Sequence, residues 1–525
     1  MNTLRSPARQ RRRVFAASAP VLAILAAVGL PACRPANPHA LSWPQRAVGV
    51  TQRGGDTYFG FDFDRDGRLD YLQRLHDGYK DRLYFPQTRG GALTHIVQRP
   101  AHHLAGRPLL LLLLDGVAYD RMNSLWRQGH FRLFRRPARL TTVFPTLTDP
   151  AYDEFFGSGP TPGYEAGFYD RRANRLNNGA LFYLCGGNEQ WVRHSDYRLA
   201  FIEDAVMYLM PERVYRTELR RARRVIDERL ARGRQHVVIY LLSTDALGHM
   251  LSPPRIEENL IRLDDWLEQL VYDYRGDLEI VMLADHGNHT TPPRRLDLRA
   301  LLHDAGFRVA DRLEKPGDVA VPEFGLLDVA RVHTFDAETR TRVVNALRVR
   351  SEVELLASPD ADDVLVFTTT ESARVRSRLS SHARTYAYDP LQGDPLHLAE
   401  TCAALRAGGQ MDAEGFASES AWLAATHAHD FPNAVPRLWH GLHTISHERP
   451  DVVLSLAPAW FVGSGFFSNM AQMHGTHGGL HRRATDTFAT TTAVDVPSPL
   501  GLRDVYELIR GTFHWDPAAH RPAAP

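Results

Sequence analysis

Three stretches decide the fold: "PLLLLLLDG" (108–116), "VVIYLLSTDALGH" (237–249) and "LEIVMLADHG" (278–287). Each begins with a mostly apolar run instead of alternating apolar and polar residues, which predicts a strand buried on both faces of a parallel sheet. Each run leads to an aspartate: Asp115, Asp245 and Asp285. Because open α/β sheets place their sites at the carboxyl edge of the strands, we expect the three carboxylates there.

The segments between these runs predict helices that cross from one strand to the next. Residues 212–233 and 255–274 carry apolar residues at helical spacing. A fourth apolar run, "DVVLSLAPAWF" from Asp451, is predicted to return to the same sheet as a late strand. The predicted fold class is therefore α/β, with a mainly parallel central sheet flanked by helices.

Residues 305–440 interrupt this pattern and are predicted to be an inserted cap subdomain. Within them, "VLVFTTTESARVRSRL" and "RTYAYDPLQGDPL" predict short strands and turns. The catalytic core would then fall into two parts, 105–304 and 441–525.

Composition fits a large folded enzyme. The chain has 525 residues, of which 44% are hydrophobic and 23% charged, and its formal net charge is +1. This balance excludes a disordered protein and gives no sign of a nucleic-acid-binding surface.

The first 33 residues predict export. Basic residues up to Arg13 precede an apolar stretch over 14–30, which is the layout of a secretory signal. The stretch ends in Leu30-Pro31-Ala32-Cys33, which resembles a lipoprotein processing box, so Cys33 is predicted to be lipidated. "RRVF" at 12–15 also resembles a twin-arginine signal. An ordinary cleaved signal, in which Cys33 is incidental, is the alternative. Both predict an exported periplasmic or cell-envelope protein, and a lipid anchor at Cys33 would be its only membrane contact.

An amino-terminal segment, 34–100, contains the acidic run "FDFDRDGRLDYLQ" (61–73). Its Gly67 permits the sharp turn that a calcium loop needs, while Gln73 stands where an EF-hand has an acidic residue. The run therefore resembles the short calcium loops of dockerin or repeat-type extracellular modules, and a solvated acidic turn is the alternative. The candidate ligands of this structural calcium are Asp62, Asp64, Asp66, Arg68 and Asp70.

A two-metal site needs carboxylates and imidazoles that converge around a nucleophile. Asp245 and His249 are four residues apart, so a strand end and the following helical turn can aim both at one ion. His286 directly follows Asp285 at another predicted strand end. These pairs, with Asp115, supply the residue types that such a site requires.

Two further motifs complete the candidate site. His477 lies in "GTHGG" (475–479), whose glycines let the backbone approach a metal or a phosphate oxygen. Thr148, in "FPTLTDPAY" (144–152), is the candidate nucleophile, because metal coordination can activate a threonine hydroxyl as an alkoxide.

Five segments, "LLDG", "FPTLTDPAY", "STDALGH", "ADHG" and "GTHGG", resemble in order the signature segments of the type I phosphodiesterase and nucleotide pyrophosphatase branch of the alkaline phosphatase superfamily. Each is weak alone, but their order and their places on strand ends make the set specific. The resemblance implies an alkaline-phosphatase-like fold and a phosphoester hydrolase. It implies two ligand sets: Asp115, Thr148, Asp285 and His286 for one ion, and Asp245, His249 and His477 for the other.

The resemblance implies two zinc ions, which suit mixed nitrogen and oxygen ligands, with manganese as an alternative. It also implies in-line attack by the Thr148 alkoxide on a small phosphoester or nucleotide, giving a phospho-threonine that a metal-bound water hydrolyses. The two ions, about 4 Å apart, would stabilise the attacking and leaving oxygens.

The chain departs from the family pattern at the phosphate-binding asparagine, which usually follows the nucleophile by about twenty residues. Phe168 occupies the approximate position, and the nearby candidates are Asn174 and Asn178. Four arginines could replace it through forked contacts, although surface charge is the simpler interpretation: Arg171, Arg172, Arg482 and Arg483.

Rival functions remain to be weighed. A sulfatase is excluded because the segment from Thr148 lacks the Cys/Ser-x-Pro-x-Arg context, and the phosphoglycerate mutase branch is disfavoured because it uses serine and is normally cytoplasmic. A phosphomonoesterase of the same superfamily stays open, since that choice depends on groups around the second substituent on phosphorus. A catalytically inactive surface-binding lipoprotein is the alternative from another class.

Overall fold

The computed structural model describes residues 46–88, 90–99, 104, 106–178, 190–199, 203, 206–323, 325–381, 383–463 and 473–522. The predicted export signal, with Cys33, lies outside the described residues. Residues 47–525 form one unit by their contacts.

A six-stranded sheet carries the three apolar runs, in the order β10-β6-β11-β24-β7-β25. The strands are β6 (Leu109–Leu114), β7 (Ala138–Thr141), β10 (His236–Leu241), β11 (Glu279–Ala284), β24 (Asp486–Thr491) and β25 (Leu500–Gly501). β10, β6 and β11 are parallel neighbours, β25 is parallel to β7, and β24 is antiparallel to β11 and β7. The predicted α/β class with a mainly parallel central sheet is confirmed.

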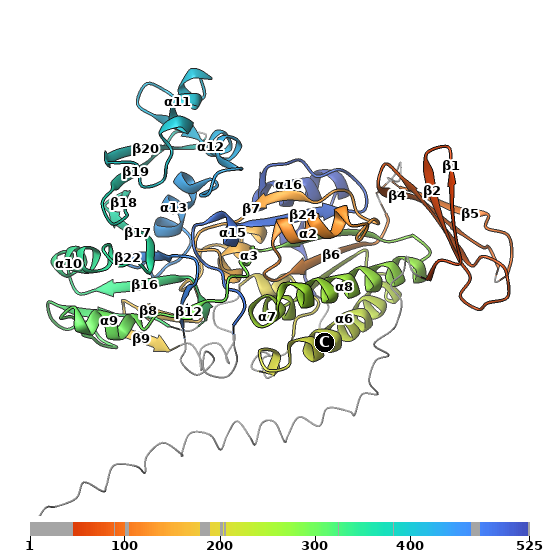
Figure 1. The fold of residues 1–525 in the computed structure, drawn as a ribbon, viewed down its shortest axis with the longest axis horizontal. Helices are drawn as coiled ribbons and strands as arrows, with labels where there is room; N and C mark the ends of the chain where they lie inside the picture. Colours follow the sequence, from red (N-terminus) through yellow and green to blue (C-terminus); the bar gives the residue numbers. More distant parts are fainter. Residues whose placement is uncertain are drawn as a thin grey trace, which may run out of the picture. The chain divides into compact units, whose positions relative to one another are not determined.

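Helices cover both faces of this sheet, which explains why all six leucines of β6 are buried. Leu109, Leu111 and Leu113 pack in one cluster with α3 (Thr148–Phe156) and α16 (Leu502–Phe513). Figure 1 shows α6 (Pro211–Ala231) and α8 (Pro253–Asp273) on the other face. The two predicted crossover helices are therefore confirmed.

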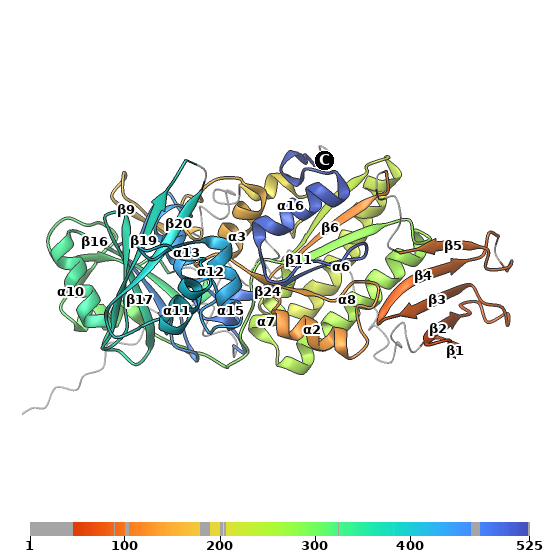
Figure 2. The same ribbon diagram turned by 90° about the horizontal axis from the view of Figure 1, so that it is seen from above.

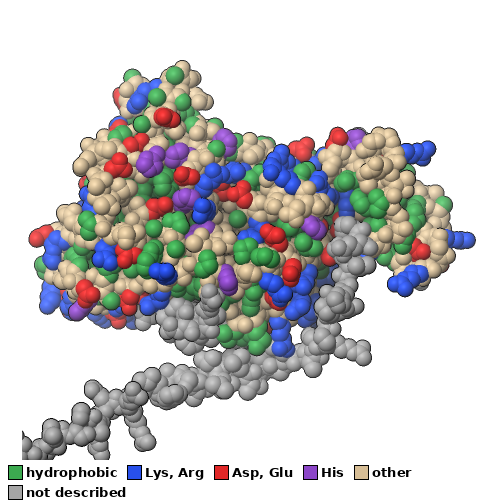
Figure 3. All heavy atoms as spheres, in the orientation of Figure 1, with side chains coloured by type: hydrophobic (Ala, Val, Ile, Leu, Met, Phe, Trp, Pro, Cys, Tyr) green, Lys and Arg blue, Asp and Glu red, His purple; other side chains and the backbone are tan. Residues whose placement is uncertain are grey.

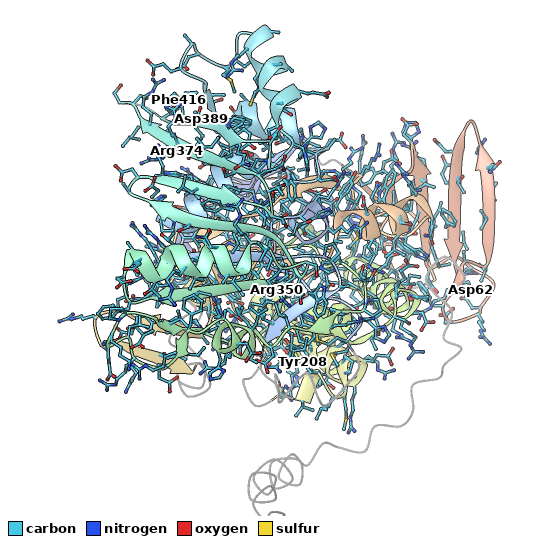
Figure 4. The ribbon with its side chains drawn as sticks, turned by 60° about the vertical axis from the view of Figure 1, so that its left-hand side comes forward. Asp62, Tyr208, Arg350, Arg374, Asp389 and Phe416 are labelled. Carbon is cyan, nitrogen blue, oxygen red and sulfur yellow. The ribbon has the colours of Figure 1, made fainter. Side chains whose placement is uncertain are left out.

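A second sheet of nine strands has the order β13-β14-β16-β22-β17-β18-β19-β20-β21. The strands are β13 (Arg308–Val309), β14 (Asp318–Ala320), β16 (Val329–Thr334), β17 (Val353–Asp360), β18 (Asp363–Phe367), β19 (Ser372–Leu379), β20 (Arg384–Gln392), β21 (Phe416–Ser418) and β22 (Val452–Leu456). Figure 2 draws β16, β17, β19 and β20 from above. Arg374, Asp389 and Phe416, labelled in Figure 4, lie on β19, β20 and β21 respectively.

The prediction for the fourth apolar run is wrong. The strand that begins after Asp451, β22, pairs antiparallel with β16 and β17 of the second sheet and not with the central sheet. The late strand of the central sheet is instead β24, which reads "DTFATT". All five residues of β22 are buried, so its apolar pattern matches that of a central strand without identifying its sheet.

Five helices flank the second sheet: α9 (Leu298–Asp304), α10 (Ala337–Leu347), α11 (Ala399–Ala407), α12 (Glu419–Thr426) and α13 (Ala434–His443). One hydrophobic cluster joins strands β17 to β20 and helices α11 to α13 with Phe144, Leu147 and Leu480. The loop before α3 and the segment after His477 therefore rest on the core of the second sheet.

Residues before the central sheet form a five-stranded antiparallel sheet: β1 (Gly49–Arg53), β2 (Asp56–Phe61), β3 (Tyr71–His76), β4 (Tyr79–Phe85) and β5 (His95–Gln98). It packs on α8. Tyr71 meets Tyr272 edge to face at 5.2 Å between centroids, and buried Lys80 pairs with buried Glu268.

Shorter elements complete the described chain: α2 (Tyr119–Arg127), β8 (Gly167–Asp170), β9 (Arg175–Asn178), η2 (Trp191–His194), α7 (Ser243–Met250), β12 (Arg294–Arg295), β15 (Leu326–Leu327), β23 (Trp460–Gly463), α15 (Arg482–Thr485) and η3 (Pro517–Ala519). Acidic and basic side chains are interspersed over the face drawn in Figure 3. Within the described residues, none of the helices combines the length and apolar character that a membrane crossing requires.

Candidate metal centre

The carboxyl edge of three neighbouring parallel strands gathers the predicted ligands. Asp115 follows β6, and Asp285 with His286 follows β11. Asp245 and His249 lie on α7, which begins two residues after β10. Since β10, β6 and β11 are adjacent and in parallel register, their ends bring these side chains together.

The first cluster consists of Asp115, Asp285 and His286, all buried, whose ligand atoms lie within 4.8 Å of one another. His286 Nε2 is 3.4 Å from Asp115 Oδ1 and 3.5 Å from Asp285 Oδ2. Thr148 begins α3, and its Oγ1 lies 3.3 Å from Asp115 Oδ2 and 3.4 Å from His286 Nε2. The candidate nucleophile therefore borders this cluster.

The second cluster consists of Asp245, His249 and His477, again buried and within 4.8 Å. Nε2 of His249 is 3.2 Å from Asp245 Oδ1, and Nε2 of His477 is 3.5 Å from the same oxygen. The structure thus brings together all seven residues that the sequence analysis assigned to the two ions.

Each of the three histidines presents Nε2 to its cluster. The Nδ1 atoms of His249, His286 and His477 lie 2.9 Å from the backbone carbonyls of Gly475, Gly287 and Thr146. A carbonyl only accepts, so Nδ1 carries the proton and the lone pair is on Nε2. Metal-ligating histidines are fixed in the same way in proteins.

In each cluster, one carboxylate oxygen also lacks a hydrogen-bond donor in the described part of the chain. Asp285 Oδ1 accepts from the backbone N–H groups of Gly116 and His286, at 3.0 and 2.8 Å. Within the described part of the chain, Asp285 Oδ2 and Asp245 Oδ1 are buried without a hydrogen-bond partner. Lone pairs from nitrogen and oxygen therefore face one another, and a bound cation would satisfy them.

Electrostatics favours a cation at the same place. Burial, and after it Asp285 and Asp245, raises the pKa of the Asp115 carboxyl well above its usual range. Burial and the neighbouring His286 lower the pKa of His477. Crowded carboxylates around Asp115 and an uncharged imidazole at His477 are both suited to a bound cation, so the residues present fit metal ions.

Two tyrosines that the sequence analysis missed hold the ligands. The hydroxyl of Tyr240 donates to the Asp115 carboxylate, and that of Tyr208 donates to Asp245 Oδ2 at 3.2 Å. The signal for Tyr240 was present, since its hydroxyl is the one polar side-chain group in the apolar run 237–242.

A cleft of about 170 Å³ opens over both clusters. Beside the candidate ligands it is lined by aromatic and aliphatic side chains, among them Tyr164, Trp191, Leu199 and Tyr208, and by the charged residues Asp149, Glu165 and Arg198. Figure 4 labels Tyr208. The cleft therefore offers an apolar surface next to Thr148.

The structure does not bring Asn174, one of the two asparagine candidates, to this cleft. Asn174 lies between β8 and β9, where its carboxamide accepts from the backbone N–H of Leu313 at 2.9 Å and donates to the Leu313 carbonyl at 3.0 Å. Asn178 is the last residue of β9. Asn174 is not among the described residues that line the cleft.

Two of the four alternative arginines form hydrogen bonds away from the cleft, and the other two are exposed. Arg171 donates to Asp451 at 2.8 Å, and Arg482 donates to the carbonyl of Ala428 at 2.9 Å. Arg172 and Arg483 are exposed, and neither is among the described residues that line the cleft.

The acidic loop between β2 and β3 gathers three of the four carboxylates among its predicted ligands. Ligand oxygens of Asp62, Asp64 and Asp70 lie within 4.8 Å of one another. Asp66 instead accepts from the backbone N–H of Arg68 at 2.8 Å, and the Arg68 side chain donates to the Gly90 carbonyl. Asp62 is labelled in Figure 4.

Comparison with known proteins identifies the chain's relatives. A family model described as type I phosphodiesterase / nucleotide pyrophosphatase matches residues 188–480, more than half of the chain. No curated protein sequence gives a significant match.

Solved structures similar to this chain include phosphonoacetate hydrolase from Sinorhizobium meliloti in complex with phosphonoformate, at 15% identity and TM-score 0.39, covering 76% of this chain and 94% of that one. They also include mouse ectonucleotide pyrophosphatase / phosphodiesterase 5, at 12% identity and TM-score 0.44, covering 79% and 98%.

Proposed function

Because the chain belongs to the type I phosphodiesterase / nucleotide pyrophosphatase family of the alkaline phosphatase superfamily, we propose that it is a two-metal phosphodiesterase with Thr148 as its nucleophile. The family makes it a hydrolase of phosphoester bonds. One observation carries the finer proposal: the hydroxyl of Thr148 borders one of two adjacent buried clusters of carboxylates and imidazoles.

Asp115, Asp285, His286 and Thr148 would hold one zinc ion, and Asp245, His249 and His477 the other. When bound, the ions supply Lewis acidity that lowers the pKa of the threonine hydroxyl and neutralises charge on the phosphoryl oxygens. Manganese is the alternative metal for the same ligands.

Thr148 is well placed for nucleophilic attack. It is the first residue of α3, so the positive end of the helix dipole favours both an alkoxide and a phosphoryl group at its Oγ1. Attack on phosphorus forms the threonine–phosphate bond and breaks the bond to the leaving alcohol. Water then hydrolyses the phospho-threonine and restores the hydroxyl.

The lining of the cleft favours a diester over a monoester. Tyr164, Trp191, Leu199 and Tyr208 give it apolar surface beside the candidate metals, which suits a second organic substituent on phosphorus. A phosphomonoesterase of the same superfamily is the runner-up, and an inactive binding lipoprotein is the alternative from another class.

Hydrolysis of bis(p-nitrophenyl) phosphate and of p-nitrophenyl phosphate by the zinc-loaded protein tests this proposal. We expect faster diester turnover, abolished in Thr148→Ala and unchanged in Thr385→Ala, a threonine of β20 in the second sheet. Faster monoester turnover would move the function to the runner-up. A protein that retains no zinc would favour the binding lipoprotein.

We also propose that Asp62, Asp64 and Asp70 bind a structural calcium ion. Buried Asp62 Oδ1 has no hydrogen-bond partner in the described chain, and Gly67 takes the left-handed conformation, φ +85°, that the turn requires. Calcium should raise the melting temperature of the wild type but not of Asp64→Asn. An equal effect on both would contradict the proposal.

We further propose that the protein is exported and that Cys33 is lipidated. The alternatives separate on fractionation of cells that express the full chain with Cys33 or with Cys33→Ser. If Cys33 is lipidated, the wild type should sediment with membranes and Cys33→Ser should not. If the signal is a plain cleaved one, both the wild type and Cys33→Ser should remain in the soluble fraction.

A further inference from the structure

The loop that carries His477 is held by a buried aspartate outside the metal ligands. Asp328 follows β15, is only 4% exposed, and contacts the loop at His477 and at Gly479. Its backbone N–H donates to the His477 carbonyl at 2.9 Å, and its Oδ1 accepts from the Gly479 N–H at 2.6 Å. One residue therefore fixes the backbone that aims the His477 ring.

A buried histidine, His289, contacts both Asp328 and the loop. His289 is 7% exposed, and its Nε2 lies 2.8 Å from Asp328 Oδ2, so it donates to the carboxylate. Its own backbone N–H and carbonyl pair with those of Thr476, each at 3.2 Å. His289 thus holds the loop one residue before His477 and orients Asp328 at the same time.

The loop fits tightly against Asp328 and its neighbour in the second sheet. A Cβ at Gly479 would lie 2.8 Å from Ser455 Oγ and 3.3 Å from Asp328 Oδ1. Ser455 lies on β22, and its hydroxyl accepts from the Leu480 N–H at 3.0 Å. The loop is therefore fastened to the second sheet.

The other residues of this cluster come from the central sheet. Asp245 and His249 lie on α7, directly after β10. The cluster therefore combines residues that follow a strand of the central sheet with a loop that is hydrogen-bonded to the second sheet. Asp328 also contacts the second sheet, since its carbonyl accepts from the Leu456 N–H of β22 at 2.8 Å.

We propose that Asp328 is a positioning residue for the second metal ion, which ties the affinity for that ion to the second sheet. The inference rests on the proposed function, in which His477 is a ligand. Without the carboxylate, Gly479 N–H and His289 Nε2–H lose their buried acceptor, and the loop can relax away from Asp245. Partners that orient metal ligands typically change affinity by about 10–100-fold.

Zinc titration with a competing chelator tests the inference on the full chain. Asp328→Ala should bind the first zinc as the wild type does and the second about 10–100-fold more weakly. Asp318→Asn is the matched control, because Asp318 is also fully buried in the second sheet and accepts from Glu314 and Lys315 N–H. It should lower the melting temperature and keep two zinc ions.

Two milder variants keep the inference testable if Asp328→Ala does not fold. Asp328→Asn retains an acceptor for Gly479 and should weaken the second zinc less than Asp328→Ala, and His289→Ala should weaken it as well. Wild-type affinity for both zinc ions in all folded variants would overturn the inference. A wild type that binds fewer than two zinc ions would instead contradict the proposed function.

Discussion

The imidazole rings of His286 and His477 stack with their centroids 3.8 Å apart and their planes inclined by 16°, although each belongs to a different cluster. The stack places the two clusters side by side. Because each ring turns Nε2 toward its own carboxylates, the two histidines mark the boundary between two cation positions. Removing either ring should therefore affect one ion more than the other.

We predict that His286→Ala and His477→Ala each reduce the zinc content from about two ions to about one. Each ion stabilises the charge of the transition state by several kcal/mol, so diester turnover should fall about 10³-fold or more in both variants. Metal analysis of the purified variants, with turnover measured in parallel, checks this. Two retained zinc ions in either variant would contradict the assignment of that histidine.

Tyr240→Phe should weaken the first zinc ion. The tyrosine hydroxyl donates to the Asp115 carboxylate, and its loss should reduce zinc affinity or turnover by about 10–100-fold. Tyr152→Phe is the matched control, since its ring lies 5.7 Å from Tyr240 and its hydroxyl donates to the Leu114 carbonyl. The prediction fails if both variants bind zinc equally well.

The sequence could predict the central sheet and its site because both depend on local patterns. Six consecutive leucines in β6 are compatible only with burial on both faces, and a strand that ends in Asp115 places that residue at the sheet edge. The sheet to which β22 belongs was not predictable in this way. A run such as "VVLSL" would be buried in either sheet, and the strands that pair with it are determined by tertiary packing.

Contacts between distant segments also escaped prediction. Asp328 meets His477 and Gly479 only after the second sheet has formed, and nothing in the residues around Asp328 marks it as different from a turn aspartate. Asn174 was a candidate by its distance from Thr148 along the chain, but hydrogen bonds to Leu313 use its carboxamide elsewhere.

The buried pair of Lys80 and Glu268 should control how firmly the amino-terminal sheet is attached. Lys80 is 5% and Glu268 1% exposed, and Gln73 also donates to Glu268 at 2.7 Å. Lys80→Met leaves an uncompensated buried carboxylate, so we expect a loss of about 3–5 kcal/mol of stability with zinc content and turnover unchanged.

Denaturant unfolding of three variants checks this expectation. The double variant Lys80→Met/Glu268→Leu removes both charges and should recover most of the loss, because apolar residues of similar size can replace a buried pair. If Lys80→Met is as stable as the wild type, the pair does not hold the sheet.

Stability should fall in mild acid because histidines whose pKa is lowered in the fold must stay neutral there. Burial, and then Arg384 and His443, lowers the pKa of His440 to about 4, whereas an unfolded histidine has a pKa near 6.5. The unfolded chain therefore binds more protons between these values. The stabilisation is complete above pH 6.5 and is lost as the pH falls toward 4, by up to about 1.4 kcal/mol per pH unit.

Chemical denaturation between pH 7 and 4 measures this slope. In the fold, the Tyr386 hydroxyl pairs with His440 Nε2, so glutamine is a substitute that can still form a polar contact but cannot take up a proton. His440→Gln should flatten the slope relative to the wild type. His303→Gln is the control, since that side chain is 80% exposed, and it should leave the slope unchanged. Equal slopes in His440→Gln and the wild type would assign the acid sensitivity to other groups.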